Sequence, residues 1–400
     1  MKLPGGNGHL TYCTNVHRGE TWDEVWGVLQ TDVLSVRGRV AADQPFALGL
    51  RLSGAALEQA SRPKALAQMK QYLADNNLYV PTLNAFPYGP FHGVRVKEDV
   101  YLPDWRDEER LRYTNASADY LAEILPEGMT GSVSTAPGAF KSNVGEAETV
   151  ADMADRFIRH AAHLVALEQR TGRSIALAIE PEPACFLETT EEAIGFFRDH
   201  LFSAAAARRL AELAGIAPDA AEAALRRHLG LCLDLCHAAV EFEEPAEVYA
   251  AIRSAGVNVA KLQISAGLRL TSVGHDTRAL LTPFDDGVYL HQVIERRGGD
   301  IARFHDLEEA FAALEASGSG DGREWRVHYH IPLFLDDLGP FSSTQSFVRE
   351  ALDLHRRDPI SQHLEVETYT WGVLPERYRT IGLARAIARE LQWVRQQFPA

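Results

Sequence analysis

The stretch Leu231-Cys-Leu-Asp-Leu-Cys-His237 places an aspartate at the end of an apolar run and a histidine three residues later. Ile175-Ala-Leu-Ala-Ile-Glu180 also ends on a carboxylate, and Leu364-Glu-Val-Glu367 closes the last apolar run of the chain with another. Short, almost continuously apolar runs are typical of parallel strands that are covered on both faces. Polar residues at the carboxyl ends of such strands converge at one end of a barrel. The pattern therefore predicts a parallel barrel with one shared polar site.

Eight apolar runs of this kind occur along the chain, which is the number that a closed (β/α)8 barrel needs. We expect strands at Leu10–Thr14, Phe46–Leu52, Leu78–Leu83, Gly131–Thr135, Ile175–Glu180, Leu231–Leu235, Val259–Ile264 and His363–Thr368. Helical patterns lie between them, as at Trp22–Leu29, Ala55–Leu73, Glu108–Leu125, Glu146–Glu168 and Pro245–Ala255. Strands that alternate with helices predict a parallel sheet. The predicted fold class is therefore α/β, a (β/α)8 TIM barrel, with residues 1–400 in one domain.

A long excursion separates Ile264 from His363 and does not fit a plain barrel. It contains a predicted β-hairpin (Tyr289–Glu295 and Ile301–His305, joined through a Gly-Gly turn), a short helix (Leu307–Leu314) and an extended segment with two histidines. We expect this insertion, at about residues 266–335, to cover the carboxyl-terminal face of the barrel as a lid. An alternative makes Arg326–Ile331 the eighth barrel strand and His363–Thr368 a ninth element.

The bulk composition limits the partners of the chain. The formal net charge is −15, whereas a nucleic-acid partner requires a basic surface. No stretch approaches the roughly 20 apolar residues of a membrane span. The opening Met1–Asn7 has no apolar signal-peptide core. The four cysteines, Cys13, Cys185, Cys232 and Cys236, form no CxxC pair and suit buried reduced thiols. We therefore expect a cytoplasmic protein without a nucleic-acid partner.

The carboxylates and imidazoles of the strand ends are the ligand types of divalent metals. Val327-His-Tyr-His330 adds two imidazoles on one side of an extended segment. We expect Glu180, Asp234 and Glu367, together with an imidazole from His237 or His330, to bind a divalent cation. Mixed oxygen and nitrogen ligands suit Mn²⁺ or Zn²⁺, and suit Mg²⁺ less well.

A metal in such a site polarises hydroxyl and carbonyl oxygens and stabilises the enediolate formed when a proton leaves the neighbouring carbon. A flanking carboxylate can carry that proton. Glu180 and Glu367 are therefore candidate catalytic residues as well as metal ligands. Lys261, on the seventh strand, is a further candidate acid or base, and the alternative is a lysine of the barrel interior that is paired with a carboxylate.

Several polar and aromatic residues follow the predicted strands and are candidates for substrate binding. These are Asn15, His17, Asn84, Tyr88, Gln263, His328 and Trp371. Each has a structural alternative: Asn15 and His17 can make the local hydrogen bonds of a tight turn, and Trp371 can serve packing. Glu182, which neighbours Glu180, is expected to be a solvated carboxylate.

The order of these residues resembles the xylose isomerase-like barrel superfamily, which contains sugar isomerases and epimerases and the endonuclease IV group. The resemblance rests on Glu at the fifth strand, Asp-x-x-His at the sixth, x-His after the seventh and Glu at the eighth. It implies that Glu180, Asp234, His237, His330 and Glu367 hold the metal. Two positions depart from the pattern. His328 stands where the family usually has Asp, and Gln263, where many members have a His ligand, offers a neutral amide oxygen.

Over nearly its full length the chain is also similar to the EboE family of metabolite-traffic proteins. The similarity lies in Gly8-His-Leu-Thr-Tyr-Cys-Thr-Asn-Val-His17, Asn84-Ala-Phe-Pro-Tyr-Gly89, Leu290-His-Gln292, Val327-His-Tyr-His-Ile-Pro-Leu333 and Glu365-Val-Glu-Thr-Tyr-Thr-Trp371. It implies a role in preparing or moving a secondary-metabolite or envelope precursor, with other proteins of that traffic pathway as partners.

The function that these features favour is a metal-dependent isomerase or epimerase acting on a polyhydroxylated small molecule. A second interpretation is a non-catalytic carrier on the same fold, which Gln263 favours because a usual ligand position lacks its imidazole. A third is metal-assisted hydrolysis, for which the acidic charge argues against a DNA substrate.

Overall fold

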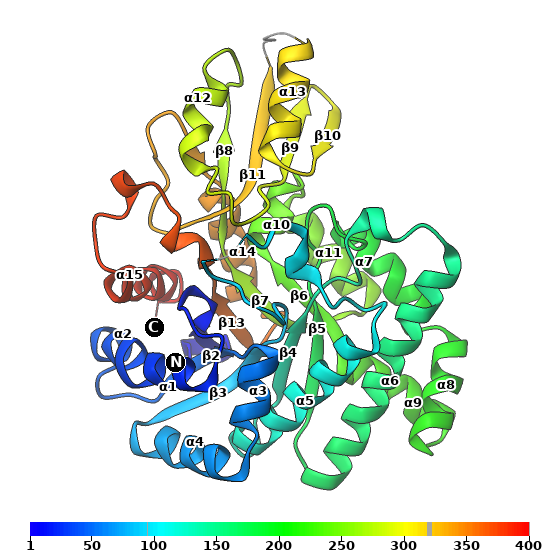
Figure 1. The fold of residues 1–400 in the computed structure, drawn as a ribbon. Coiled ribbons are helices and arrows are strands. Elements are labelled where there is room, and N and C mark those ends of the chain that lie inside the picture. Colours follow the sequence, from blue (N-terminus) through cyan, green and yellow to red (C-terminus); the bar gives the residue numbers. More distant parts are fainter. Residues whose placement is uncertain (94, 318–321, 400) are drawn as a thin grey trace.

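A computed structural model of the protein describes residues 1–93, 95–317 and 322–399 and places eight parallel strands in a nearly closed barrel (Figure 1). The barrel strands are β1 (His9–Tyr12), β2 (Phe46–Arg51), β3 (Leu78–Asn84), β4 (Gly131–Thr135), β5 (Ile175–Ile179), β6 (Leu229–Asp234), β7 (Asn258–Ile264) and β13 (His363–Val366). Their order is β1-β13-β7-β6-β5-β4-β3-β2, and a parallel bridge between Cys13 and Gly49 connects the two edges. The predicted (β/α)8 fold and all eight of its strands are confirmed.

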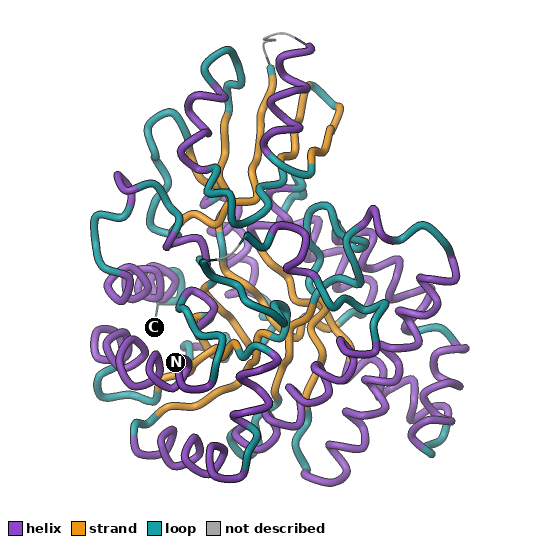
Figure 2. Tube along the Cα trace, in the orientation of Figure 1, coloured by secondary structure: helices purple, strands orange, loops and turns teal. Residues whose placement is uncertain are grey.

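Helices form the outer layer around these strands (Figure 2). They are α1 (Trp22–Val28), α2 (Leu34–Val40), α3 (Gly54–Ala60), α4 (Pro63–Asp75), α5 (Glu108–Ile124), α6 (Ala147–Thr171), α7 (Thr190–Phe196), α8 (Ala204–Ala214), α9 (Pro218–His228), α10 (Leu235–Val240), α11 (Pro245–Ala255), α14 (Gln345–Arg357) and α15 (Leu383–Gln396). The helix predicted at 55–73 is two helices, because Pro63 lacks an N–H and begins α4 instead of continuing α3. In the described part of the chain no helix is long and apolar enough to cross a membrane.

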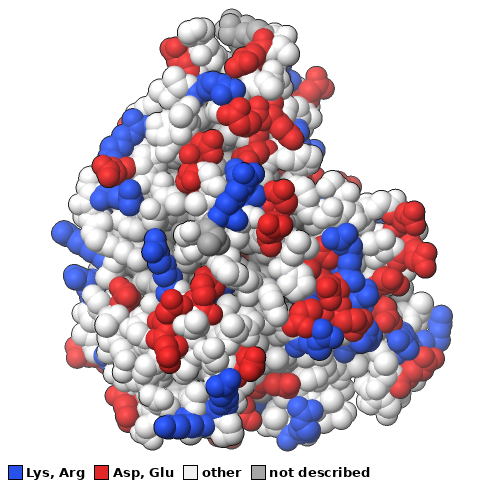
Figure 3. Space-filling view, viewed as in Figure 1, with Lys and Arg blue, Asp and Glu red and all other residues white. Residues whose placement is uncertain are grey.

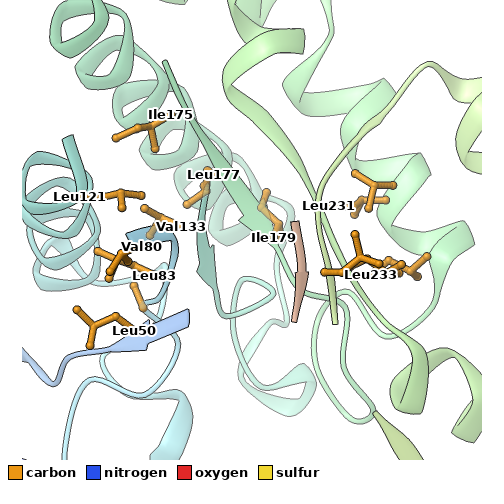
Figure 4. Packing of buried hydrophobic residues seen from close by; sticks show 14 of the residues in the cluster. Leu50, Val80, Leu83, Leu121, Val133, Ile175, Leu177, Ile179, Leu231 and Leu233 are labelled. Carbon is orange, nitrogen blue, oxygen red and sulfur yellow. The ribbon is translucent and has the colours of Figure 1, made fainter. Parts of the chain in front are cut away.

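The outward faces of the strands and the inward faces of the helices share one apolar core. Leu50, Val80, Val133 and Leu177 are fully buried in it, from four neighbouring strands, and Figure 4 shows Leu121 of α5 packed among them. Burial of each such side chain contributes roughly 1.5–3 kcal/mol. This core explains why the outward-facing positions of the strands are apolar.

The inside of the barrel is partly apolar, with a small cluster of Ala176, Ala178, Cys232 and Ala260, and partly polar. Lys261 of β7 and Glu365 of β13 are both fully buried and form an ion pair. Lys261 Nζ also donates to Ser134 Oγ at 3.1 Å, and Thr11 Oγ1 donates to Glu365 Oε2 at 3.2 Å. Burial acts to lower the pKa of Lys261, but the Glu365 carboxylate raises it above the ordinary value. Lys261 is therefore in the position that the second interpretation gave it, inside the barrel and paired with a carboxylate.

Glu365 fits inside the barrel because residue 49 has no side chain, and we expect Gly49→Ala to destabilise the fold. A Cβ built on Gly49 would lie 1.4 Å from Glu365 Oε2 and 3.1 Å from the carbonyl oxygen of Tyr12. Overpacking of this kind costs about 1–3 kcal/mol. Urea denaturation should show the loss, with Gly27→Ala as the matched control, because a Cβ there meets no described atom within 4 Å. Equal stability of Gly49→Ala and wild type would refute this account.

The insertion after β7 builds a second, antiparallel sheet, which stands above the barrel in Figure 1. Its strands are β8 (Ala266–Leu270), β9 (Val293–Arg297), β10 (Asp300–Phe304), β11 (Arg323–Ile331) and β12 (Ser342–Ser343), in the order β10-β9-β11-β8-β12. Two helices accompany it, α12 (Thr277–Leu281) and α13 (Leu307–Ser317). Because β8 begins two residues after β7 ends, this sheet rises from the carboxyl end of the barrel strands. The alternative in which Arg326–Ile331 is a barrel strand is wrong, since this segment lies in β11.

The predicted hairpin and helix of the insertion are confirmed as β9, β10 and α13. The hairpin begins at Val293 instead of Tyr289, because the pairing of β9 with β10 starts at Val293, opposite Phe304. Ion pairs connect the insertion to the loops of the barrel: Lys97 Nζ lies 2.5 Å from Asp306 Oδ2, and Arg303 pairs with both Glu241, at 2.7 Å, and Glu188, at 3.6 Å. That the insertion acts as a lid stays a prediction.

Candidate metal and substrate site

Four side chains from neighbouring strand ends meet at the carboxyl end of the barrel. They are Glu180 after β5, Asp234 at the end of β6, Gln263 in β7 and Glu367 after β13, and we call them the carboxylate cluster. Gln263 Nε2 lies 2.5 Å from Glu180 Oε1, 3.0 Å from Asp234 Oδ2 and 2.7 Å from Glu367 Oε2. An amide nitrogen has two hydrogens, so Gln263 cannot donate fully to all three carboxylates at once.

Burial and mutual repulsion set the ionisation of these carboxylates. Burial, followed by the charges of Glu367 and Asp234, raises the pKa of Glu180 well above its ordinary value. Burial and Asp234 raise the pKa of Glu367 to about 8. Burial also acts to raise the pKa of Asp234, but His237 and the other polar neighbours hold it below the ordinary value. Three carboxylates so close together cannot all ionise unless positive charge joins them.

The Asp-x-x-His spacing has a local structural reason. Asp234 is the N-cap of α10, and its Oδ1 accepts hydrogen bonds from the backbone N–H groups of Cys236 at 2.7 Å and His237 at 3.0 Å. The cap turns the chain directly after β6 and holds His237 in the first turn of the helix. His237 Nδ1 then donates to the carbonyl oxygen of Pro181 at 2.8 Å. Asp234 and His237 are thus positioned together by one turn of chain.

Two more imidazoles approach from the insertion. His328 and His330 stand on one face of β11, and their Nδ1 atoms lie 2.8 Å from Gln292 Oε1 and 2.9 Å from the carbonyl oxygen of Glu367. Burial lowers the pKa of His330 to about 4 and that of His328 well below the ordinary value. His237, His328 and His330, which we call the imidazole cluster, each offer a nitrogen atom within 4.8 Å of the other two.

A cavity opens beside both clusters. Its polar floor contains Asn15, Asn84, Glu180, Glu182, His237, His328 and Glu367, and its aromatic walls contain Phe86, Phe91, Tyr101, Tyr289 and Tyr369. Asn15 Nδ2 and Asn84 Nδ2 both donate to Glu367 Oε1, at 2.7 and 3.2 Å. Tyr289 belongs to the insertion, which therefore contributes part of the cavity wall.

The structure separates some residues that the sequence grouped as candidates. His17 donates to or accepts from Tyr12 Oη at 3.1 Å and lines a different, smaller cavity. Tyr88 donates to Glu109 Oε1 at 2.9 Å in an outer groove. Trp371 packs into the apolar core of the insertion. Lys261 lies in the barrel interior with Glu365 and is not among the residues that line the cavity.

Sequence reasoning missed Glu182, which we expected to be solvated. This expectation is wrong: the residue is 7% exposed and lines the cavity, and its Oε1 accepts a hydrogen bond from Tyr101 Oη at 2.9 Å. Burial raises the pKa of Glu182 to about 7. The signal that could have identified it is Pro181 and Pro183 on either side, since two prolines favour a rigid turn.

Comparison with known proteins finds solved structures of similar fold at low sequence identity. No known family profile matches the chain, and no curated protein matches it. A xylose isomerase-like TIM barrel protein from Mycobacterium smegmatis, solved in complex with magnesium, is 13% identical, with a TM-score of 0.51 over 98% of this chain and 96% of that one. A xylose isomerase domain protein from Planctomyces limnophilus is 12% identical, with a TM-score of 0.48 over 98% and 97%. D-Psicose 3-epimerase from Clostridium cellulolyticum H10, solved with D-tagatose, is 11% identical, with a TM-score of 0.47 over 98% and 100%.

These identities are too low to carry an activity across. The first similarity, together with the eight-stranded parallel barrel, shows that this chain has the fold of the xylose isomerase-like TIM barrels.

Proposed function

We propose that this protein is a divalent-metal-dependent isomerase or epimerase that acts on a polyhydroxylated small molecule. The observation that carries the proposal is the convergence of three buried carboxylates, Glu180, Asp234 and Glu367, beside a cavity at the carboxyl end of the barrel. Active sites of this fold are built at that end.

The residues present fit a cation. Glu180 Oε2 is buried without a hydrogen-bond partner among the described residues, and the repulsion within the cluster favours a positive charge there. Glu180, Asp234 and Glu367, with an imidazole from His237 or His330, would hold Mn²⁺ or Zn²⁺, and less readily Mg²⁺. Rotation of the Gln263 amide by half a turn would present its oxygen to the cluster as a neutral ligand.

When bound, the metal supplies the positive charge that stabilises an enediolate. The remaining work falls to the side chains. Glu180 and Glu367 would take a proton from one carbon of the substrate and return it to the same or the adjacent carbon. Asn15 and Asn84 fix the orientation of the Glu367 carboxylate through its Oε1. The aromatic walls keep bulk water away from the reacting carbons.

The proposed substrate is a small metabolite. The site is a cavity, and acidic and basic side chains alternate over the face of the molecule shown in Figure 3 instead of forming a continuous basic stripe. The resemblance to EboE proteins suggests a secondary-metabolite or envelope precursor as the substrate and other proteins of the same traffic pathway as partners.

Solvent deuterium tests the reaction directly. Protein loaded with Mn²⁺ in D₂O should incorporate deuterium next to the carbonyl carbon of ketoses and aldoses from a panel, as measured by NMR. Glu180→Gln should reduce the rate by about 10²–10⁴-fold, because it removes a proton carrier. Isomerisation or exchange that continues unchanged in Glu180→Gln would contradict the assignment.

The second candidate function is a carrier, and Gln263 is the observation that favours it. Its amide nitrogen contacts all three carboxylates and so draws them together without a metal. A carrier would bind a polyol in the same cavity and exchange no deuterium. Binding measured by calorimetry without any exchange would therefore favour the carrier over the enzyme.

A further inference from the structure

The cavity contains a further carboxylate, Glu182, that lies outside the carboxylate cluster. The residue is 7% exposed and lines the cavity two positions after Glu180. Gln263 donates to the three members of the cluster, and in the described part of the chain it makes no hydrogen bond to Glu182. A divalent ion held by the cluster would therefore leave Glu182 without a cation of its own.

A short chain of hydrogen bonds fixes the direction of the Glu182 carboxylate. Gln292 Nε2 donates to the carbonyl oxygen of Pro183 at 3.1 Å and to Tyr101 Oη at 3.2 Å. The hydroxyl of Tyr101 has one hydrogen, which it donates to Glu182 Oε1 at 2.9 Å. Oε1 is thereby occupied, whereas Oε2 accepts no hydrogen bond from the residues that the structure describes. The second oxygen is therefore free for a ligand.

The imidazole nearest to Glu182 does not supply a second donor. His328 Nδ1 lies 3.8 Å from Glu182 Oε1, which is beyond hydrogen-bond distance, and it lies 2.8 Å from Gln292 Oε1 instead. An ionised carboxylate has about four lone-pair sites, and buried polar groups are normally hydrogen-bonded. Glu182, with a single donor in the described chain, is therefore under-satisfied until a molecule enters the cavity.

The walls of the cavity add aromatic rings to this carboxylate. The ring centres of Phe91, Tyr289 and Tyr369 are 5.1–5.5 Å apart in each pair, so the three rings form one aromatic surface. Phe86 stands beside Tyr101, with ring centres 5.8 Å apart. Because the face of an aromatic ring attracts cations, rings next to a carboxylate form a suitable environment for an ammonium group.

The cavity offers little to an anionic ligand apart from the proposed metal. In the described part of the chain, Lys97 is the one lysine or arginine that lines it, and Lys97 Nζ donates to Asp306 Oδ2 at 2.5 Å. The charge of this lysine is thus matched within the protein. A phosphate group on the substrate would lie among carboxylates, and like charges placed side by side disfavour binding. A positive group would instead be attracted.

We propose that Glu182, oriented by Tyr101, binds an ammonium group of the substrate, so that the natural ligand is an amino-substituted polyol and not a sugar phosphate. The inference deepens the proposed function and rests on it, since the metal would hold oxygen atoms of the same molecule. The ammonium donates to Glu182 Oε2 in a charge-assisted hydrogen bond, and its remaining charge faces the aromatic rings. A hydroxyl in that place would supply the hydrogen bond but not the charge.

Calorimetry on the full-length, Mn²⁺-loaded protein tests this preference. The probes are D-glucose, D-fructose and their amino-deoxy derivatives, at a pH at which the amines are protonated. At least one amino sugar should bind about 10–100-fold more tightly than its parent sugar, the gain expected of a hydrogen bond to a charged group. Its N-acetyl derivative, which carries no charge, should lose that gain. The phosphate esters of the parent sugars should bind more weakly than the parents.

Variants locate the preference at Glu182. Glu182→Gln, which keeps the shape but removes the charge, should reduce the preference for the amine to about twofold or less. Tyr101→Phe keeps the carboxylate but removes the hydroxyl that orients it, so the preference should fall by a smaller factor. Glu58→Gln removes the same charge from a side chain that is 79% exposed and should keep the full preference.

Two results would overturn the amine subsite. One is a wild-type protein that binds no amino sugar more tightly than its parent, including the case in which none of the probes binds. The other is a Glu182→Gln variant, folded by circular dichroism, that keeps the full preference. If Glu182→Gln does not fold, the wild-type panel and Tyr101→Phe decide the question.

The amine subsite and the isomerase fail in different ways. Deuterium exchange on neutral sugars without any preference for amines would refute the subsite and leave the isomerase standing. A preference for amines that Glu182→Gln removes, without deuterium exchange on any sugar, would refute the isomerase. The subsite would then stand as the specificity site of a carrier.

Discussion

Replacing Lys261 with methionine is expected to destabilise the protein by about 3–5 kcal/mol, the loss that follows when one partner of a buried ion pair is removed. Lys261 and Glu365 are both fully buried and in contact. Methionine fills nearly the same volume but leaves the Glu365 carboxylate without its counter-charge in the interior of the barrel. Urea denaturation monitored by circular dichroism measures the change.

The double variant Lys261→Met/Glu365→Gln is the matched control, and it should recover a large part of the loss because a neutral amide replaces the unpaired charge. The same pair of variants tests the alternative role of Lys261. If this residue were a catalytic base that reached the substrate, Lys261→Met would keep the stability of wild type and lose deuterium exchange. That combination would contradict the structural role assigned here.

The second large effect concerns the carboxylate cluster. Mn²⁺ added to chelated wild-type protein at about a hundred times its dissociation constant should stabilise the fold by about 2.7 kcal/mol. For a chain of this length, that is a rise in Tm on the order of 3 °C. Glu367→Gln should abolish the rise, since it removes a ligand and relieves the repulsion that a cation would neutralise. Asp234→Asn should do the same.

Mn²⁺ is the suitable probe because it accepts the mixed oxygen and nitrogen ligands of this cluster. Glu182→Gln is the control: Glu182 is a buried carboxyl group of the same cavity but lies outside the carboxylate cluster, so the variant should keep the Mn²⁺-dependent rise. If wild type shows no shift with Mn²⁺, Zn²⁺ or Mg²⁺ after chelation, the metal proposal fails and the carrier becomes the better description.

Local patterns in the sequence were sufficient to predict the barrel. Strands such as Ile175–Ile179 are apolar at every position because helices cover one face and the packed barrel interior the other, and this requirement is visible in a run of five residues. The hairpin of β9 and β10 could be predicted from an equally local pattern, since Gly298, with a φ of +63°, occupies a turn that favours glycine. Strand β8 was not predicted, because it pairs with β11 and β12, which are distant in sequence.

Within the site, the sequence by itself determined which residues stand at the strand ends, because a residue at the end of an apolar run leaves the strand at its carboxyl end whatever its neighbours are. Glu180, Asp234 and Glu367 could therefore be named before any contact was known. The tertiary structure alone decided what those residues touch. Gln263 meets Glu367 across 104 positions of sequence, and Lys261 pairs with Glu365 of the neighbouring strand inside the barrel instead of lining the cavity. Such partners are set by distances in space, and a linear pattern of residue types does not contain those distances.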